Sequence, residues 1–174
     1  MNILKEKKSL IEMKNVELVN LLKEKKLHIT IAESCTGGLA SSAIVDVPNA
    51  SDVFEMGFVL YSNEAKTSRI GVREKIIAQY GVVSEDCVAE MADCAAYEAG
   101  ADVAIAISGI AGPDGGSKEK PVGMVCFGYH ILGNLYLETQ QFGNLGRNEV
   151  RAKAVENAID RCYELLTEVI EDND

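Results

Sequence analysis

Three groups of polar residues each follow a stretch that is predicted to be a strand, and each group can take part in acyl transfer or anion binding. They lie at residues 34–38, 61–66 and 108–116. In open α/β sheets, ligands collect outside the carboxyl ends of the strands, where helix N-termini and loop amides face outward. If the three strands are parallel neighbours, the three groups converge on one site.

Ser34 and Lys66 are the candidate nucleophile and base. Ser34 occupies a turn between a predicted strand and a helix, although its surroundings lack the GxSxG elbow of hydrolases. His28 and His130 are poorly placed to activate it, whereas a Lys66 partly desolvated in a pocket has a lowered pKa and can accept a proton. From these residues alone, a helix cap at Ser34 and a surface position for Lys66 remain the favoured interpretation.

The cysteines and acids indicate neither a disulfide scaffold nor a metal centre. Cys35 is a competing thiol nucleophile, but no neighbouring cation or base in the sequence favours its thiolate, so we interpret it as a packing residue. The five cysteines contain no CxxC pair. No pair of His, Asp or Glu at helical spacing resembles a metal site, and we expect neither a metal nor a cofactor.

Two further features can bind anions. The Gly-rich stretch from Gly109 to Gly116 lacks a P-loop or dinucleotide fingerprint, yet its glycines would allow backbone N–H groups to approach a phosphate; a flexible surface loop is the alternative. Arg147 and Arg151 lie one turn apart at the start of the last predicted helix and can share one face. An ion pair with a nearby glutamate is the competing interpretation, and it is favoured for Arg151.

Hydrophobic periodicity and turn signals predict the elements that position these residues. Strands are expected at residues 27–32, 54–61, 103–107, 122–131 and 135–142, with helices at 13–25, 39–45, 84–100 and 148–170 and a short amphipathic piece at 72–80. Ser84 is the expected N-cap of its helix, and Gly100 the expected end. Gly133-Asn134 is a hairpin turn signal between the last two predicted strands, so the sheet is expected to be mixed.

Length, composition and charge limit the number of domains, the kinds of partner and the location that can be expected. A chain of 174 residues suits one domain, so we expect a single site. The net charge of −10 disfavours nonspecific nucleic-acid binding, and the lysine clusters at residues 5–8 and 23–26 are interpreted as solvated helical faces. No stretch approaches the length of a membrane span, and the first residues lack the apolar run of a signal peptide, so a cytoplasmic location is expected.

Five linked motifs then form a recognisable pattern: AESCTGG at residues 32–38, YSNEAK at 61–66, YGVVS at 80–84, GIAGPDGG at 109–116 and KPVG at 120–123. Their order and spacing resemble the CinA C-terminal domain family, including its stand-alone PncC-type amidases, over a core of about residues 16–166. The resemblance implies a three-layer α/β/α sandwich with a central mixed β-sheet, a homodimer, and hydrolysis of nicotinamide mononucleotide to nicotinic acid mononucleotide and ammonia in pyridine nucleotide recycling.

The resemblance also implies roles for individual residues. Ser34 matches the nucleophile, Lys66 the general base and Tyr61 a tyrosine that assists proton transfer. The positions expected to contact the nucleotide substrate or its oxyanion are Thr36, Gly37, Gly38, Ser51, Ser108, Gly109 and Arg147. Arg147 is the natural partner of the phosphate, and the N–H groups of residues 36–38 are the candidate oxyanion donors.

Two departures from the family pattern and three alternatives remain. Ser108 stands where the family usually has threonine, and the stretch before Arg147 is longer than the usual Gly-Asp-Arg. The alternatives are a noncatalytic nucleotide-binding module, an interaction protein linked to competence or DNA damage, and an amidase for a different small amide. The acidic charge disfavours direct contact with nucleic acid.

Overall fold

The computed structural model describes the backbone of residues 2–173 and the side chains of residues 14–172. The side chains of the lysine cluster at residues 5–8 therefore lie outside the described residues. In chain order the elements are α1 (Asn2–Lys25), β1 (Ile29–Glu33), α2 (Leu39–Val45), the 3₁₀ helix η1 (Ala50–Asp52), β2 (Phe58–Val59), α3 (Asn63–Ile70), α4 (Glu74–Tyr80), α5 (Glu85–Ala99), β3 (Val103–Gly109), β4 (Met124–Ile131), β5 (Asn134–Gln141) and α6 (Arg147–Asn173).

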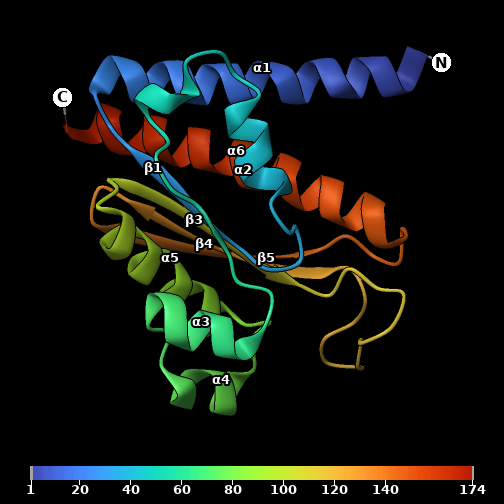
Figure 1. The fold of residues 1–174 in the computed structure, drawn as a ribbon. Helices are drawn as coiled ribbons and strands as arrows, with labels where there is room; N and C mark the ends of the chain where they lie inside the picture. Colours follow the sequence, from blue (N-terminus) through green and yellow to red (C-terminus); the bar gives the residue numbers. More distant parts are fainter. Residues whose placement is uncertain (1, 174) are drawn as a thin grey trace.

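The described strands form one five-stranded sheet in the order β2-β1-β3-β4-β5 (Figure 1). β1 pairs in parallel with both β2 and β3, whereas β4 runs antiparallel to β3 and β5 antiparallel to β4. The predicted mixed sheet is therefore confirmed. Because β1, β2 and β3 are parallel neighbours, their carboxyl ends meet at one edge of the sheet, which is the condition that the convergence of the three polar groups required.

Helices cover both faces of the sheet and make three layers, as predicted. α1, α2 and α6 lie on one side, where α1 packs along α6, and α3, α4 and α5 lie on the other (Figure 1). β3 supplies side chains to both hydrophobic cores because neighbouring side chains of a strand point to opposite faces. Ile105 and Ile107 join the core under α6, whereas Ala106 joins the core under α5.

The end signals of α5 agree with the predictions, and the β4–β5 hairpin is present, but its turn is Leu132-Gly133 rather than the expected Gly133-Asn134, because Asn134 pairs with Ile131 as the first residue of β5. The Ser84 hydroxyl accepts a hydrogen bond from the N–H of Cys87, and Gly100 ends the helix in the left-handed conformation with φ 60°. Leu132 and Gly133 both have positive φ, as a two-residue type I′ turn requires. Local turn chemistry therefore determines both features.

Two predicted strands differ from the structure. The expected strand at 54–61 contains only two residues of β2, because this edge strand pairs solely with β1, through Phe58 and Val59. The strand expected at 27–32 is β1, which starts later and ends later, at Glu33. The first helix begins at Asn2 rather than at residue 13.

None of the helices formed by the described residues is both long enough and apolar enough to cross a bilayer.

Candidate active site

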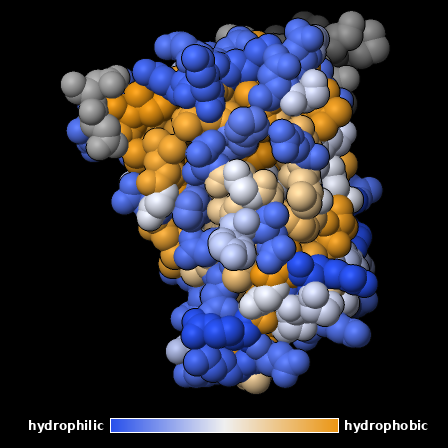
Figure 2. Space-filling view, turned by 60° about the vertical axis from the view of Figure 1, so that its left-hand side comes forward, coloured by the Kyte–Doolittle hydropathy of each residue, from blue (hydrophilic) through white to orange (hydrophobic). Residues whose placement is uncertain are grey.

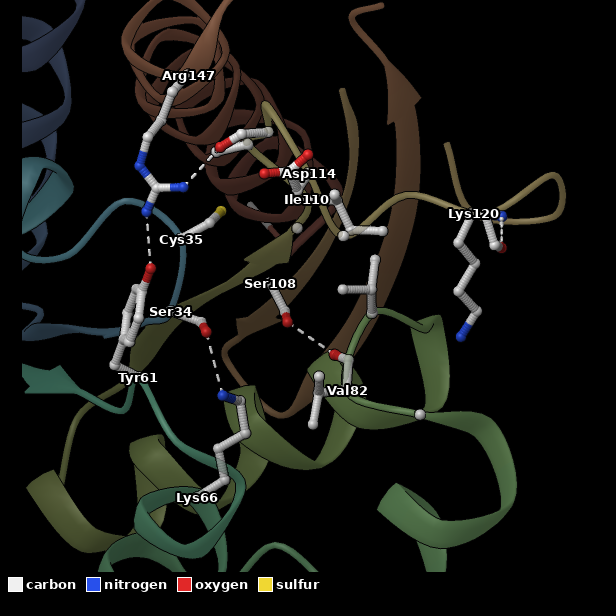
Figure 3. A pocket seen from close by; sticks show the side chains of 17 residues that line it. Ser34, Cys35, Tyr61, Lys66, Val82, Ser108, Ile110, Asp114, Lys120 and Arg147 are labelled. Carbon is white, nitrogen blue, oxygen red and sulfur yellow. Dashed lines mark hydrogen bonds between the residues drawn. The ribbon is translucent and has the colours of Figure 1, made fainter. Parts of the chain in front are cut away.

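A cavity of about 460 Å³ opens at the carboxyl ends of β1 and β3 (Figure 3). The three polar groups predicted to converge all contribute to it, together with the segment before α5 and the start of α6. Its lining residues are Ser34, Cys35, Tyr61, Lys66, Gly81, Val82, Val83, Ser108, Gly109, Ile110, Ala111, Gly112, Asp114, Gly115, Ser117, Lys120 and Arg147. The convergence is therefore confirmed.

Ser34 and Lys66 point toward one another in this cavity (Figure 3). Lys66 Nζ lies 3.1 Å from Ser34 Oγ and donates to the carbonyl of Leu60 at 2.7 Å. An uncharged amine in this position can keep its donation to Leu60 and accept the proton of the Ser34 hydroxyl through its lone pair. The pair thus has the geometry of a nucleophile and its base.

α3 is responsible for burying Lys66. Ser62 caps this helix by accepting from the N–H of Ala65 at 3.0 Å, and Lys66 and Ile70, one turn apart, form its buried face. Lys66 is 1% exposed. Burial lowers the pKa of the Lys66 amine below its usual 10.5, because the charged form loses its hydration.

Cys35 is buried beside Ser34, and the structure supports its interpretation as a packing residue. Burial raises the pKa of its thiol to about 11, and this effect outweighs the opposing influence of the residue's own backbone N–H and of the Arg151 charge. The thiol is therefore protonated at neutral pH, and a protonated thiol is a poor nucleophile.

Ser108 and Gly109 end β3 at the floor of the cavity. The Ser108 hydroxyl donates to the carbonyl of Val82 at 2.7 Å, which leaves its oxygen lone pairs available to a ligand. A Cβ at Gly109 would lie 2.6 Å from a methyl carbon of Val125, so the close approach of β4 excludes a side chain at this position. Both predicted substrate-contacting residues line the cavity.

Arg147 reaches the cavity from the first turn of α6. Its guanidinium donates to the carbonyl of Gly112 and to the hydroxyl of Tyr61, both at 2.7 Å. Tyr61 accepts from Arg147 rather than bonding to Ser34 or Lys66, which leaves its own O–H free to donate. The longer stretch before Arg147 therefore still places this cation in the cavity (Figure 3).

The nucleophile turn contradicts part of the predicted oxyanion site. The N–H of Gly38 donates to the buried carboxylate of Glu33 at 3.0 Å, and the N–H of Gly37 donates to the carbonyl of Ser34 at 3.1 Å. Neither N–H is free for a substrate oxygen, so the expected roles of Gly37 and Gly38 as donors are wrong. Thr36 is fully buried and does not line the cavity.

Ser51 does not reach the cavity either. It is exposed in η1, and the next turn of chain bonds to the first residue of β1 through the carbonyl of Val53 and the N–H of Ile29. η1 therefore lies at the amino end of β1, whereas Ser34 follows its carboxyl end. The expected contact of Ser51 with a substrate in this cavity is not supported.

Comparison with known proteins agrees with this geometry. The family model of the CinA C-terminal domain matches residues 12–166. The chain belongs to the CinA C-terminal domain family. A nicotinamide-nucleotide amidohydrolase PncC from Enterobacter agglomerans is 50% identical over 140 residues, which are 80% of this chain and 85% of that protein.

Longer proteins and solved structures of the CinA family match as well. A CinA-like protein from Kosmotoga olearia is 46% identical over 82% of this chain, but the match spans only 34% of that protein. The crystal structure of the competence/damage inducible protein CihA from Agrobacterium tumefaciens has a TM-score of 0.87 and 36% identity, and the match covers 89% of this chain and 94% of CihA. The mixed sheet and its helical layers are therefore the CinA fold.

Within this CinA-type site, the roles of two charged residues were missed by sequence reasoning. Glu33 is 0% exposed and accepts from the N–H groups of Gly38, Ala40 and Ser41 and from the Ser41 hydroxyl. Only its place inside the AESCTGG motif pointed to it. Arg151 bonds to backbone carbonyls instead of the expected glutamates, so the ion-pair interpretation is wrong.

Three other polar side chains of the lining, Asp114, Ser117 and Lys120, received no role from the sequence. Lys120 lies across the cavity from Arg147 (Figure 3). Its Nζ donates to the carbonyl of Tyr80 at 2.5 Å. Among the residues with described side chains, no group of three His, Cys, Asp or Glu is arranged to hold a metal ion. The His130 ring lies 2.8 Å from Asp93 and is hydrogen-bonded to it, whereas His28 donates to Asp102 through its backbone N–H; neither histidine lines the cavity.

Proposed function

We propose that this chain hydrolyses the carboxamide of nicotinamide mononucleotide to nicotinic acid mononucleotide and ammonia, as a step in pyridine nucleotide recycling. The observation that carries the proposal is the buried Lys66 amine, 3.1 Å from the Ser34 hydroxyl in a cavity that also contains Arg147. The name of the Enterobacter agglomerans relative, nicotinamide-nucleotide amidohydrolase, supports the choice of substrate.

In the acylation step, Ser34 Oγ attacks the amide carbon while its proton passes to Lys66 Nζ. The lowered pKa of Lys66 supports this role, because only the uncharged amine can accept a proton. The carbonyl oxygen becomes an oxyanion that N–H donors beside Ser34 stabilise. The C–N bond then breaks, the nitrogen takes up a proton, and ammonia leaves an acyl-enzyme on Ser34.

Tyr61 is placed to supply that proton to the leaving nitrogen. Its hydroxyl accepts from Arg147, so its own hydrogen points elsewhere and can be donated. The proton that Lys66 took from Ser34 then passes to the Tyr61 oxygen, which restores both the amine and the phenol. In the second half of the reaction, water attacks the acyl carbon and gives a proton to Lys66, which delivers it to Ser34 Oγ as the ester bond breaks. The acid product leaves and ionises to the carboxylate.

Substrate binding uses the polar groups around this pair. Arg147 offers a planar cation suited to a phosphate, and it is already held in the cavity by Gly112 and Tyr61. Ser108 offers hydroxyl lone pairs and Gly109 close backbone approach at the floor. A mononucleotide can thus place its anionic end at Arg147 and its amide at Ser34.

The test incubates the purified protein with nicotinamide mononucleotide and a chelator, and follows ammonia and nicotinic acid mononucleotide. Ser34→Ala and Lys66→Ala are expected to reduce kcat by about a thousandfold or more, because each removes one half of a unit that acts together. Cys35→Ala is the matched control, one residue from the nucleophile, and is expected to retain turnover.

The other outcomes favour the alternatives. Loss of turnover only in Cys35→Ala would move the nucleophile to the thiol. Binding of the nucleotide without turnover by the wild type would support a noncatalytic binding module. Turnover of other small amides at a higher kcat/KM would keep the dyad and change the substrate.

A further inference from the structure

Arg151 holds the turn that follows the nucleophile. From the second turn of α6, its Nε donates to the carbonyl of Cys35 at 3.0 Å and its Nη2 to the carbonyl of Thr36 at 2.9 Å. Its Nη1 donates to the side chain of Asn148 at 3.3 Å. All three guanidinium nitrogens therefore have protein partners, and two of them bond to consecutive peptide groups.

These bonds fix the direction of the peptide planes, because the C=O and N–H of a trans peptide point in opposite directions. With its carbonyl held by Arg151, the peptide that joins Thr36 to Gly37 points its N–H away from the cation, and that N–H donates to the carbonyl of Ser34 at 3.1 Å. The carbonyl of Ser34 belongs to the peptide whose N–H is that of Cys35. One chain of dipoles thus runs from the guanidinium to the Cys35 N–H.

The end of this chain lies at the cavity, where the Cys35 N–H bonds only to the thiol of its own residue. Among the described residues, the N–H of Cys35 has no acceptor in another residue, and Cys35 lines the cavity beside Ser34. In α/β-hydrolases, the residue after the nucleophile supplies an oxyanion-binding N–H, since the turn presents both groups to the same carbonyl. Hydrogen bonds arranged in a chain also polarise one another, which strengthens the last donor.

We propose that Arg151 is a positioning residue that orients the Cys35 N–H as an oxyanion donor. The inference rests on the proposed amidase function. Arg151 acts through the backbone of Ser34, Thr36 and Gly37 and does not contact the substrate.

The experiment compares Arg151→Gln and Arg151→Lys with Arg161→Gln as the matched control. Arg161 lies on the same helix, loses the same charge, and bonds to Glu164 outside the cavity. Each protein is tested for kcat and KM with nicotinamide mononucleotide. Each is also tested for labelling of Ser34 by phenylmethylsulfonyl fluoride, which forms a sulfonate ester at Oγ as fluoride leaves and needs no nucleotide pocket.

Arg151→Gln is expected to reduce both kcat and the labelling rate by about ten- to a hundredfold, somewhat less than deletion of an oxyanion donor, because the N–H remains but is no longer held. KM and the acid limb of the pH profile are expected to stay unchanged, since neither the phosphate site nor Lys66 is touched. Arg151→Lys should recover part of the loss, and Arg161→Gln should match the wild type.

Three results would overturn the inference. They are a kcat in Arg151→Gln within about twofold of the wild type, a rise in KM alone, or equal losses in Arg161→Gln. If the wild type fails to hydrolyse nicotinamide mononucleotide but Ser34 is labelled, the substrate proposal fails while the labelling rates still decide the role of Arg151. If the wild type neither hydrolyses nicotinamide mononucleotide nor is labelled at Ser34, both proposals fail. Thermal melting of each variant identifies a loss that is due to unfolding.

Discussion

The Lys66 amine is buried without an acidic partner. Among the described side chains, none of the ion pairs includes Lys66, and its hydrogen-bond partners are a hydroxyl and a carbonyl. Burial of a cation without a counter-charge disfavours the folded state, because lost hydration is not replaced. The burial that lowers the pKa of Lys66, and so favours its role as a base, therefore also destabilises the protein.

Replacement of this amine by an apolar group of similar shape tests whether the catalytic base is kept at the expense of stability. Lys66→Met is expected to abolish turnover and to raise Tm at pH 7, by about 2–4 °C for each kcal/mol of destabilisation that it removes. The folded-state pKa of Lys66 lies below the unfolded value of 10.5, so between these two values the unfolded state binds more protons. Wild-type stability therefore rises with pH through this window, and the advantage of the variant should disappear above it.

Thermal melts of both proteins at several pH values provide the measurement. Lys66→Arg is the matched control for chemistry, because a guanidinium stays charged and cannot act as the base. In the wild type, kcat/KM should rise with pH as Lys66 loses its proton. A Lys66→Met variant that melts below the wild type at pH 7 would contradict the argument.

At the scale of elements, the cap of α5 connects stability to the shape of the cavity. Ser84 accepts from the N–H of Cys87 and donates to the carbonyl of Gly81, and Gly81 belongs to the cavity lining. Ser84→Ala is expected to reduce the free energy of unfolding by about 0.5–2 kcal/mol, since an N-cap is lost. Urea unfolding measures this change.

Ser68→Ala is the control for the cap prediction, because Ser68 is exposed on α3 and its replacement should change stability by no more than about 0.5 kcal/mol. A fall in kcat/KM is also expected for Ser84→Ala, since the bond that holds Gly81 is broken. Equal stability of the two variants would show that the cap contributes nothing.

A helix or strand could be predicted where the residues that begin and end it lie within its own sequence. α5 has its cap and its terminating glycine within its own sequence, and both were read correctly. β2 could not be delimited, because residues 54–61 are apolar enough for a strand while only Phe58 and Val59 find partners on β1. Pairing with a distant strand, rather than propensity, decides where an edge strand ends.

The same distinction between local and distant determinants explains which parts of the site could be predicted. Ser34 and Lys66 follow strand ends, so their meeting was predictable on the condition that their strands are parallel neighbours, and the pairing of β1 with β2 and β3 meets that condition. The partners of Arg151 were not predictable, because Cys35 and Thr36 lie more than a hundred residues away in the chain. A backbone carbonyl also leaves no signature in the sequence, so the ion pair with a nearby glutamate was the natural expectation.

For the whole molecule, the homodimer that the family resemblance implies is still a prediction. Hydrophilic side chains predominate on the face drawn in Figure 2, and the hydrophobic ones form several separate areas among them. The net charge of −10 opposes association at long range, so a dimer must gain its stability from short-range contacts and should persist or tighten as salt is added.

Light scattering of the purified protein at low and high salt checks this prediction. A mass of twice 18.8 kDa under both conditions is the expected result. A mass of 18.8 kDa at every salt concentration would contradict it.

Arg147 already has two partners before any substrate arrives, the carbonyl of Gly112 and the hydroxyl of Tyr61. A phosphate that binds its guanidinium competes with them, so occupancy of the cavity releases the loop that Gly112 anchors. We expect amide hydrogen exchange in residues 109–116 to accelerate when nicotinic acid mononucleotide is bound, and to be fast without ligand in Arg147→Gln. Slower exchange would show that Arg147 keeps both partners. If the loop is released, bound product loosens the very segment that encloses it, and departure from the cavity becomes easier with each turnover.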